Sequence, residues 1–357
     1  MAAGFRALVN SAKKLAIGDS GSKADAPEAL FPTVDPAVDG DDCDHDCASC
    51  VVRYPKGFKI DEDEPLFGLV KGWSTHILVA TGKTDWVRDV ADEKGSVMQA
   101  IAGTKAPSNG RLMLSASNIP TPHHLSDYSE PTTVLLLPAF TIIENVTPAT
   151  VPALITSFVS KAPTNTSPLA PVSLPRALPA PLPEATPAAL TELTSRPCPH
   201  RALILLCSQR TRDARCGQSA PLLRKELQRW LQPLGLYRDL DDERPGGVGI
   251  YFISHVGGHK YSANMMVYRR PDAFGVDGVE RGKLGEGEAV TPKKVEPAEE
   301  GEEGEGDVGA GQCIWLARVK PEDCEGIVKF TVLQGKVVKP GSQLRGGFDR
   351  GRGVMSW

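Results

Sequence analysis

The chain has little of what marks membrane, secreted or nucleic-acid-binding proteins. Its longest apolar run, "TVLLLPAFTII", is interrupted by a proline and is well short of the roughly 18 residues that cross a bilayer. It shows no secretory signal-peptide pattern. The net charge of -4 at pH 7 gives no electrostatic attraction to nucleic acid or to a membrane surface. We therefore expect no membrane and no nucleic acid among its partners.

Cysteine and histidine are scarce, with 8 and 7 copies in 357 residues. Eight cysteines in a chain of this length, without a secretory signal, do not indicate a disulfide scaffold. We expect a reducing compartment, where clustered cysteines more often serve metals or redox chemistry. The spacing of these few residues is therefore informative.

Alternating strand and helix patterns predict an α/β fold with two domains. "HILVATG" and "RALILLCS" are typical of buried strands, and "SAPLLRKELQRWLQPLG" has the apolar spacing of an amphipathic helix. Proline-rich and acidic segments without periodicity separate the patterned parts. The predicted organisation is a disordered tail at 1–42, a first domain at 43–161, a proline-rich linker at 162–197, a second domain at 198–345 with a disordered acidic insertion at 272–311, and a flexible C-terminal tail at 346–357.

Two cysteines and two histidines follow strands of the second domain. Cys207 and Cys216 flank "SQRTRDAR" after one strand, and His255 and His259 flank "VGG" after another. In a parallel strand pair from one α/β unit, both loops leave at the same end of the sheet, so the four side chains can converge. Gly257 and Gly258 allow a sharp turn. The cationic neighbours Arg212, Arg215 and Lys260, together with Arg210, would offset thiolate charge.

The residues alone leave three interpretations open. Each cysteine or histidine could be an ordinary packing or hydrogen-bonding residue. A structural Cys₂His₂ zinc site is a second possibility, although eight residues between the cysteines is loose for zinc. A [2Fe–2S] cluster is a third, because it spans two irons and tolerates wider spacing.

The strings "LLCSQRTRDARCGQSAPLL", "ISHVGGHKYSANMMVY" and "IWLARV" resemble the sucrase/ferredoxin-like family, a family of thioredoxin-like ferredoxins. The resemblance implies two thioredoxin-like domains, each a central sheet flanked by helices, the second carrying a [2Fe–2S] cluster. By motif, Cys207 and Cys216 match the thiolate ligands, and His255 and His259 match the imidazole ligands.

From this resemblance we predict an electron-transfer protein of cytosolic redox homeostasis, an electron carrier rather than an enzyme, serving an unidentified redox partner. Neutral, protonatable imidazole ligands would couple electron transfer to proton transfer. Two alternatives stay open: a zinc-stabilised binding module without a redox role, and a thiol oxidoreductase using Cys47 and Cys50. The "CDHDCASC" segment, with Cys43, Cys47 and Cys50, fits thiol redox, a second metal, or an incidental structural role.

The chain ends in Met355, Ser356 and Trp357. This tripeptide resembles the C-terminal signal by which several cytosolic iron–sulfur proteins dock to the cytosolic assembly machinery. The resemblance predicts that machinery as a partner and the cytoplasm as the location. The weakly basic start, "MAAGFRALVNSAKKLAIG", leaves a mitochondrial location as the alternative.

Overall fold

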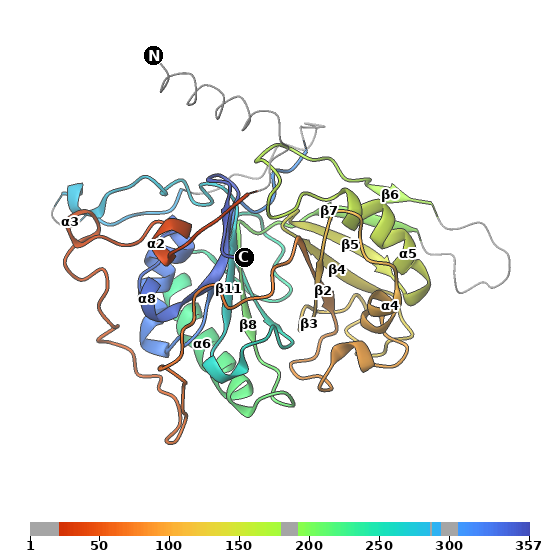
Figure 1. Cartoon of the computed structure of the whole chain (residues 1–357), viewed down its shortest axis with the longest axis horizontal. Coiled ribbons are helices and arrows are strands. Elements are labelled where there is room, and N and C mark those ends of the chain that lie inside the picture. Colours follow the sequence, from red (N-terminus) through yellow and green to blue (C-terminus); the bar gives the residue numbers. More distant parts are fainter. Residues whose placement is uncertain (1–20, 180–191, 286–287, 294–305) are drawn as a thin grey trace, which may run out of the picture.

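The computed structural model describes residues 21–179, 192–285, 288–293 and 306–357, and the side chain of His259 lies outside that description (Figure 1). The described residues form a mixed α/β structure with a large central sheet of 14 strands and few helices. The predicted α/β class is confirmed at this level. None of the helices in these ranges combines the length and the apolar character needed to cross a membrane.

The first half of the sheet begins with a strand buried along its whole length, as the apolar "HILVA" predicts. Strand β2 (Thr75–Ala80) is parallel to β3 (Leu112–Ser117) and antiparallel to β4 (Thr132–Leu137), which pairs with β5 (Thr141–Val146). Helix α4 (Val97–Gly103) connects β2 to β3 and begins at Ser96, whose side chain accepts a hydrogen bond from the Gln99 amide. A helical segment from α5 (Val151–Ala153) through a π-helical turn at Leu154–Phe158 follows. These helices cover one face of the sheet (Figure 1).

The second half repeats this order. Strand β8 (Ala202–Cys207) is parallel to β10 (Val248–Ile253) and antiparallel to β11 (Met265–Arg269), which pairs with β12 (Gln312–Leu316). Helix α6 (Ala214–Leu231) connects β8 to β10, and its buried face carries Leu223, Leu227 and Leu231. A helical segment from α7 (Cys324–Gly326) through Ile327–Val332 packs on the same side. The two halves meet where β10 pairs antiparallel with β3, at Ile253 and Ser117.

Peripheral elements extend the sheet at both edges. Beyond β12 lie β13 (Leu344–Asp349), β14 (Val354–Met355) and β1 (Ser22–Lys23), while beyond β5 lie β7 (Leu193–Pro197) and β6 (Ala177–Leu178). The two-residue β9 (Tyr237–Arg238) pairs with β10. Short helices complete the fold: α2 (Pro27–Leu30), α3 (Pro36–Asp39) and α8 (Pro340–Gln343).

Several segments predicted to be disordered or extended are part of the fold instead. Within the tail predicted at 1–42, residues 1–20 lie outside the described residues, but Leu30 and Phe31 are fully buried. The linker predicted at 162–197 contains β7, which pairs with β5. Within the acidic insertion predicted at 272–311, residues 286–287 and 294–305 are outside the description, whereas Phe274 and Val276 are buried. The tail predicted at 346–357 contains β14 and most of β13.

Candidate functional site

The sequence-predicted site lies where β8 and β10 end. Cys207 is the last residue of β8 and is paired in register with Ile253, the last residue of β10. His255 follows two residues later, and its backbone amide donates to Gln209 Oε1 at 2.8 Å. Cys216 lies in the first turn of α6, which begins after Asp213. Three of the four predicted residues therefore gather at one end of the second half.

The two thiols are buried and interact directly. Cys207 and Cys216 are 2% and 0% exposed. The hydrogen bond from Cys216 is the main cause that lowers the pKa of Cys207 to about 5; burial opposes it, and His255 reinforces it through its own hydrogen bond and charge. The same hydrogen bond and burial raise the pKa of Cys216. The two sulfurs thus share one proton and titrate as a pair.

The loop after β10 turns through Gly257 and Gly258, both in the left-handed region, with φ of 89° and 64°. This region favours glycine because it has no Cβ. A Cβ at Gly258 would also collide with the guanidinium of Arg345. The sharp turn predicted at these two glycines is present in the structure. At Gly258 the residue that leaves no room for a side chain is Arg345, which no sequence pattern had indicated.

Arg345 lies on β13 and is 4% exposed. Its Nη1 donates to Gly257 O at 2.8 Å and to Asn264 Oδ1 at 2.9 Å. Its guanidinium also lies 4.3 Å from the ring centroid of Trp315. Burial lowers the pKa of Arg345 to about 10, although the charges of Tyr261 and Cys207 oppose that shift.

The cations predicted beside the site are mostly engaged elsewhere. Arg215 forms an ion pair with Asp213 at 2.8 Å, and Lys260 pairs with Glu64. Arg212 Nη1 donates to Arg88 O at 3.4 Å. Arg215 still interacts electrostatically with Cys216. The buried cation beside the thiols is therefore Arg345 rather than these partly exposed side chains.

Hydrogen bonds connect the loop after β8, which carries the site, to the first half of the sheet. Ser208 Oγ donates to Thr84 O at 2.7 Å, and Thr211 Oγ1 donates to Asp85 Oδ2 at 2.8 Å. The buried side chain of Gln209 reaches the carbonyls of Trp86 and Val87. The loop that carries the cysteines is thus fixed to the loop that follows β2.

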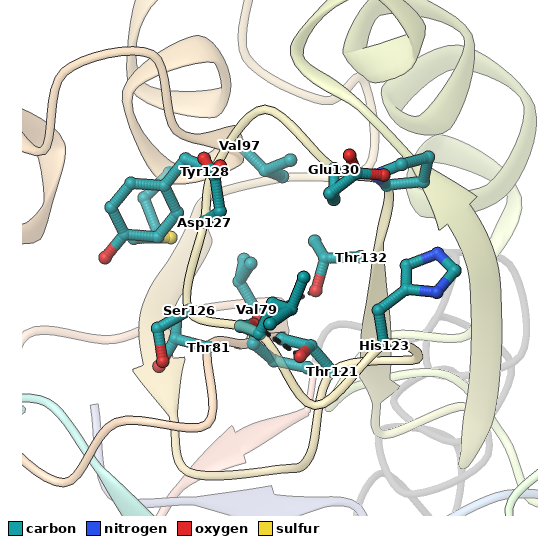
Figure 2. Close-up of a pocket in the computed structure, with 14 residues that line it drawn as sticks. Val79, Thr81, Val97, Thr121, His123, Ser126, Asp127, Tyr128, Glu130 and Thr132 are labelled. Atoms are coloured by element: carbon teal, nitrogen blue, oxygen red, sulfur yellow. Dashed lines mark hydrogen bonds between the residues drawn. The ribbon is translucent and has the colours of Figure 1, made fainter.

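In the first half, β2 ends at Ala80 and Thr81 follows it, and neither residue has a thiol. A hollow there is lined by Val79, Thr81 and Thr132, with Tyr128 and His123 on opposite sides (Figure 2). Its volume is about 10 Å³, roughly the space of one water molecule. Among the described residues, no thiol lies at the end of β2 in the way that Cys207 lies at the end of β8.

The remaining cysteines lie apart from this site. Cys43, Cys47 and Cys50 are buried, and Cys47 and Cys50 pack with Val52 against Leu222 and Trp230. Burial raises the pKa of the Cys43 and Cys50 thiols, which makes them poorer nucleophiles. No disulfide joins any of the eight cysteines, all of which are within the described residues.

The C-terminal tripeptide is packed into the fold. Met355 belongs to β14, and Ser356 is fully buried. The Ser356 amide donates to Gly347 O at 3.0 Å, and the Gly347 amide donates to Ser356 Oγ at 3.0 Å. The Trp357 ring lies 4.3 Å from that of Trp73.

Two sets of curated relatives match parts of the chain. Actin patches distal protein 1 of Saccharomyces cerevisiae is 30% identical over 255 residues, which cover 66% of this chain and 74% of the relative. Altered inheritance of mitochondria protein 32 of Clavispora lusitaniae is 28% identical over 140 residues, 39% of this chain and 33% of the relative. The protein of that name from Meyerozyma guilliermondii is 27% identical over 137 residues, 38% of this chain and 32% of the relative. The chain thus matches about a third of the length of the two mitochondrial-inheritance relatives. No solved structure matches.

These findings correct the predicted function. Cys207 contacts Cys216 and His255, but among the described residues no group of three or more His, Cys, Asp or Glu side chains is arranged to hold a metal ion. The relatives are named for actin patches and mitochondrial inheritance. The prediction of an iron–sulfur electron-transfer protein is therefore wrong as stated, whereas the four ligand assignments stay a prediction because the side chain of His259 lies outside the described residues. Among the described residues, the zinc module has no support from a metal-binding group either. The relatives' names give no support to an oxidoreductase using Cys47 and Cys50, and burial raises the pKa of the Cys50 thiol, which makes it a poor nucleophile.

The family resemblance itself is confirmed. The sequence profile of the sucrase/ferredoxin-like family matches residues 66–346. That range includes both halves of the sheet, the cysteine loop, the Gly257–Gly258 turn and Arg345. The chain belongs to the sucrase/ferredoxin-like family.

Proposed function

We propose that Cys207 and Cys216 form a dithiol that is oxidised reversibly to a disulfide, so that the chain responds to a small oxidant. The observation that supports this most is the burial of both thiols at one end of the second half, where each affects the ionisation of the other. A thiolate is the nucleophilic form of cysteine, and a neighbouring thiol can resolve its oxidised product.

The chemistry needs a peroxide as the oxidant. The Cys207 thiolate attacks one oxygen of hydrogen peroxide, which breaks the O–O bond and gives a sulfenic acid and hydroxide. The Cys216 sulfur then attacks the Cys207 sulfur and displaces a second hydroxide, which takes up the Cys216 proton and becomes water. In sum, one thiolate, one thiol and one peroxide give one disulfide, one water and one hydroxide, and the hydroxide takes a proton from the solvent. Because both sulfurs are almost fully buried, a small oxidant suits the site better than a protein disulfide.

We also propose a thioredoxin-like arrangement for each half. The orders β3-β2-β4-β5 and β10-β8-β11-β12 are the same, with one parallel and two antiparallel pairs in each. Cys216 lies in the first turn of the helix that follows the first strand of its half. A helix N-terminus favours nearby negative charge, and therefore a thiolate–thiol pair.

The [2Fe–2S] cofactor implied by the family resemblance stays a prediction. The residues that would hold it are Cys207, Cys216, His255 and His259. Two adjacent thiols with an imidazole in contact are suitable donors for such a group. Two further points likewise stay predictions. One is that the assembly machinery binds the chain through Met355, Ser356 and Trp357, and the other is the cytoplasmic location. A partner that reads this tripeptide would have to release Ser356 from its hydrogen bonds with Gly347.

The test uses the full-length protein as isolated. Hydrogen peroxide is added, and intact mass spectrometry with peptide mapping follows the loss of two hydrogens and the position of the new disulfide. We expect a Cys207–Cys216 link in the wild type, and none in Cys207→Ser or Cys216→Ser. Cys198→Ser is the matched control: Cys198 is also buried, and burial raises its pKa to about 11, so its loss should change nothing.

Two results would overturn the proposal. One is a wild type that keeps both thiols at peroxide doses that oxidise a free thiol. The other is iron and sulfide bound to the isolated protein through Cys207 and Cys216, because ligated sulfurs are not available as a dithiol. Iron and acid-labile sulfide are measured on the same preparation, so the cofactor prediction is decided at the same time.

A further inference from the structure

A cleft is lined by residues of both halves, on the face of the sheet away from α6. Its volume is about 270 Å³, near the lower end of the range for small-molecule sites, roughly 300 Å³. Tyr251 of β10 lines the cleft, whereas its neighbours Ile250 and Phe252 pack in the core under α6. Because successive side chains of a strand point to opposite faces, the cleft and the helix lie on opposite sides of the sheet.

Apolar side chains form a large part of the cleft wall, and they come from both halves. Leu135 on β4 and Ile142 on β5 belong to the first half, and Leu240, which follows β9, belongs to the second. All three are buried or partly buried. Such a wall favours the hydrocarbon part of a bound molecule, because contact with it removes apolar surface from water.

His200 and Tyr251 add a polar pair to this wall. His200 Nε2 lies 3.0 Å from Tyr251 Oη, and the two residues are 3% and 7% exposed. Gly249 leaves space for the imidazole, since a Cβ there would lie 2.8 Å from His200 Cδ2. Burial lowers the pKa of His200 to about 4 and raises the pKa of Tyr251, so the pair is uncharged at neutral pH.

The other imidazole nitrogen of His200 is unsatisfied. Nδ1 is buried and has no hydrogen-bond partner among the described residues. A buried polar atom without a partner is unfavourable, and most such atoms in folded proteins have one. A hydroxyl group of a bound molecule could supply it for either tautomer of His200, because a hydroxyl both donates and accepts.

Acidic side chains outnumber basic ones in the cleft lining. The lining includes one arginine and four carboxylates: Arg196, Glu144, Asp241, Asp242 and Glu243. Arg196 pairs with both Glu144 and Glu243, and Asp242 pairs with Arg244. Asp241 is exposed, and no cation of a described residue pairs with it. Carboxylates still outnumber the arginines when Arg238, whose charge also reaches Asp242, is counted.

We propose that this cleft binds a small organic cation: an amine with an apolar body that carries a hydroxyl group. The ammonium group faces Asp241, the apolar body lies against the aliphatic wall, and the hydroxyl bonds to His200. The site is separate from the proposed dithiol, because none of Cys207, Cys216 and His255 is among the residues that line the cleft.

The experiment titrates the full-length protein with three probes that share a phenol ring and differ in charge. Tyramine is a cation, para-ethylphenol is neutral and para-hydroxyphenylpropionate is an anion. Isothermal titration calorimetry at low salt measures the dissociation constant of each. We expect tyramine to bind at one site per chain, about two- to fivefold more tightly than para-ethylphenol, which is the effect of one exposed ion pair. The anion should bind most weakly, and high salt should narrow the differences.

Two variants assign the polar groups. Asp241→Asn should weaken tyramine binding by about two- to fivefold and leave the binding of para-ethylphenol unchanged. Asp63→Asn is the matched control, because Asp63 is also exposed but does not line the cleft. His200→Phe should reduce the preference for tyramine over phenethylamine, which lacks the hydroxyl, by about two- to tenfold. If His200→Phe does not fold, the same two probes on the wild type still test the hydroxyl, and tyramine should bind more tightly.

A third variant fills the cleft. Thr133 lies on the same face of β4 as Leu135 and is only partly buried, so Thr133→Phe should fold and abolish the binding of tyramine. Three results would overturn the proposal: no binding of tyramine at millimolar concentration, equal affinities for the three charge forms, or tyramine binding that survives Thr133→Phe.

Discussion

Trp357, the last residue of the chain, packs against Trp73, which precedes β2 in the first half. Their ring centroids are 4.3 Å apart and their planes are inclined by 33°. Trp73 is 2% exposed and also contacts Trp315 at 5.5 Å, so the pair extends the core between the halves. Gly72 has no Cβ at the place where one would overlap the Trp357 ring. The C-terminus is thus a packed element of the structure.

Removing this contact should lower the stability of the whole chain. We expect Trp357→Ala to reduce the free energy of unfolding by about 2 kcal/mol, below the 3–5 kcal/mol of a fully buried tryptophan, because the Trp357 ring is half-buried. Urea unfolding measures it. Val51→Ala, at a residue that is 84% exposed, is the control and should cost almost nothing. An unchanged unfolding midpoint for Trp357→Ala would show that the ring leaves Trp73 in solution.

A second prediction separates backbone strain from loss of space. Gly258→Ala places a Cβ both in left-handed backbone and against Arg345, whereas Gly95→Ala meets only the strain, since its φ is 73° and no atom lies within 4 Å of the added carbon. We expect Gly95→Ala to cost about 1 kcal/mol of unfolding free energy and Gly258→Ala about 1–3 kcal/mol more. Equal costs in urea unfolding would mean that Arg345 moves aside freely.

The sequence was sufficient to locate the thiol site, for a physical reason. β8 and β10 are parallel neighbours from one α/β unit, so loops after both strands leave at the same sheet edge, and Cys207 and His255 meet there. The helix between them brings Cys216 to the same end. These are consequences of local patterns, which a sequence carries directly.

Arg345 was missed because its neighbourhood has no such pattern. "RGGFDRGRG" is rich in glycine and arginine, a composition typical of flexible tails. In the fold those glycines allow neighbouring groups to approach the backbone closely. Ser356 Oγ lies where a Cβ of Gly346 would be, and the carbonyl oxygen of Cys313 lies where a Cβ of Gly347 would be. Leu30 and Phe31 were missed for a similar reason: two buried residues in a small-residue segment are too few to show a period.

A third prediction concerns the proton shared by the sulfurs. The hydrogen bond from Cys216 is the first cause of the low pKa of Cys207, so Cys216→Ala should raise that pKa from about 5 toward the ordinary range of a thiol. At pH 6.5 we expect Cys207 to be alkylated at least roughly tenfold more slowly in the variant than in the wild type. Iodoacetamide kinetics from pH 5 to 9 measure it, with Cys198→Ala as the control. A pH profile unaffected by the loss of Cys216 would refute the shared proton.

The last prediction concerns acid stability and two buried histidines outside the site. His76 is fully buried, with Nδ1 3.1 Å from Tyr268 Oη and Nε2 3.0 Å from Ser115 Oγ. Burial lowers the pKa of His76 to about 3 and that of His200 to about 4, from an ordinary value of 6.5.

Between the folded and unfolded pKa values, the unfolded chain binds a proton at each histidine that the folded chain does not. Their contribution to stability is therefore complete above about pH 6.5 and is lost as the pH falls toward 4 and below. Moving from pH 7 to pH 5 should cost about 2 kcal/mol of unfolding free energy for each histidine.

Urea unfolding of the wild type and His76→Gln at pH 7 and pH 5 tests this. Glutamine can still bond both hydroxyls but does not titrate, so the loss between the two pH values should shrink by about 2 kcal/mol. His45→Gln, at a residue whose side chain is 71% exposed, should leave that loss unchanged. If the His76→Gln protein loses as much stability in acid as the wild type, His76 already exchanges its proton with solvent in the folded state, and the hydroxyl pair around it opens readily.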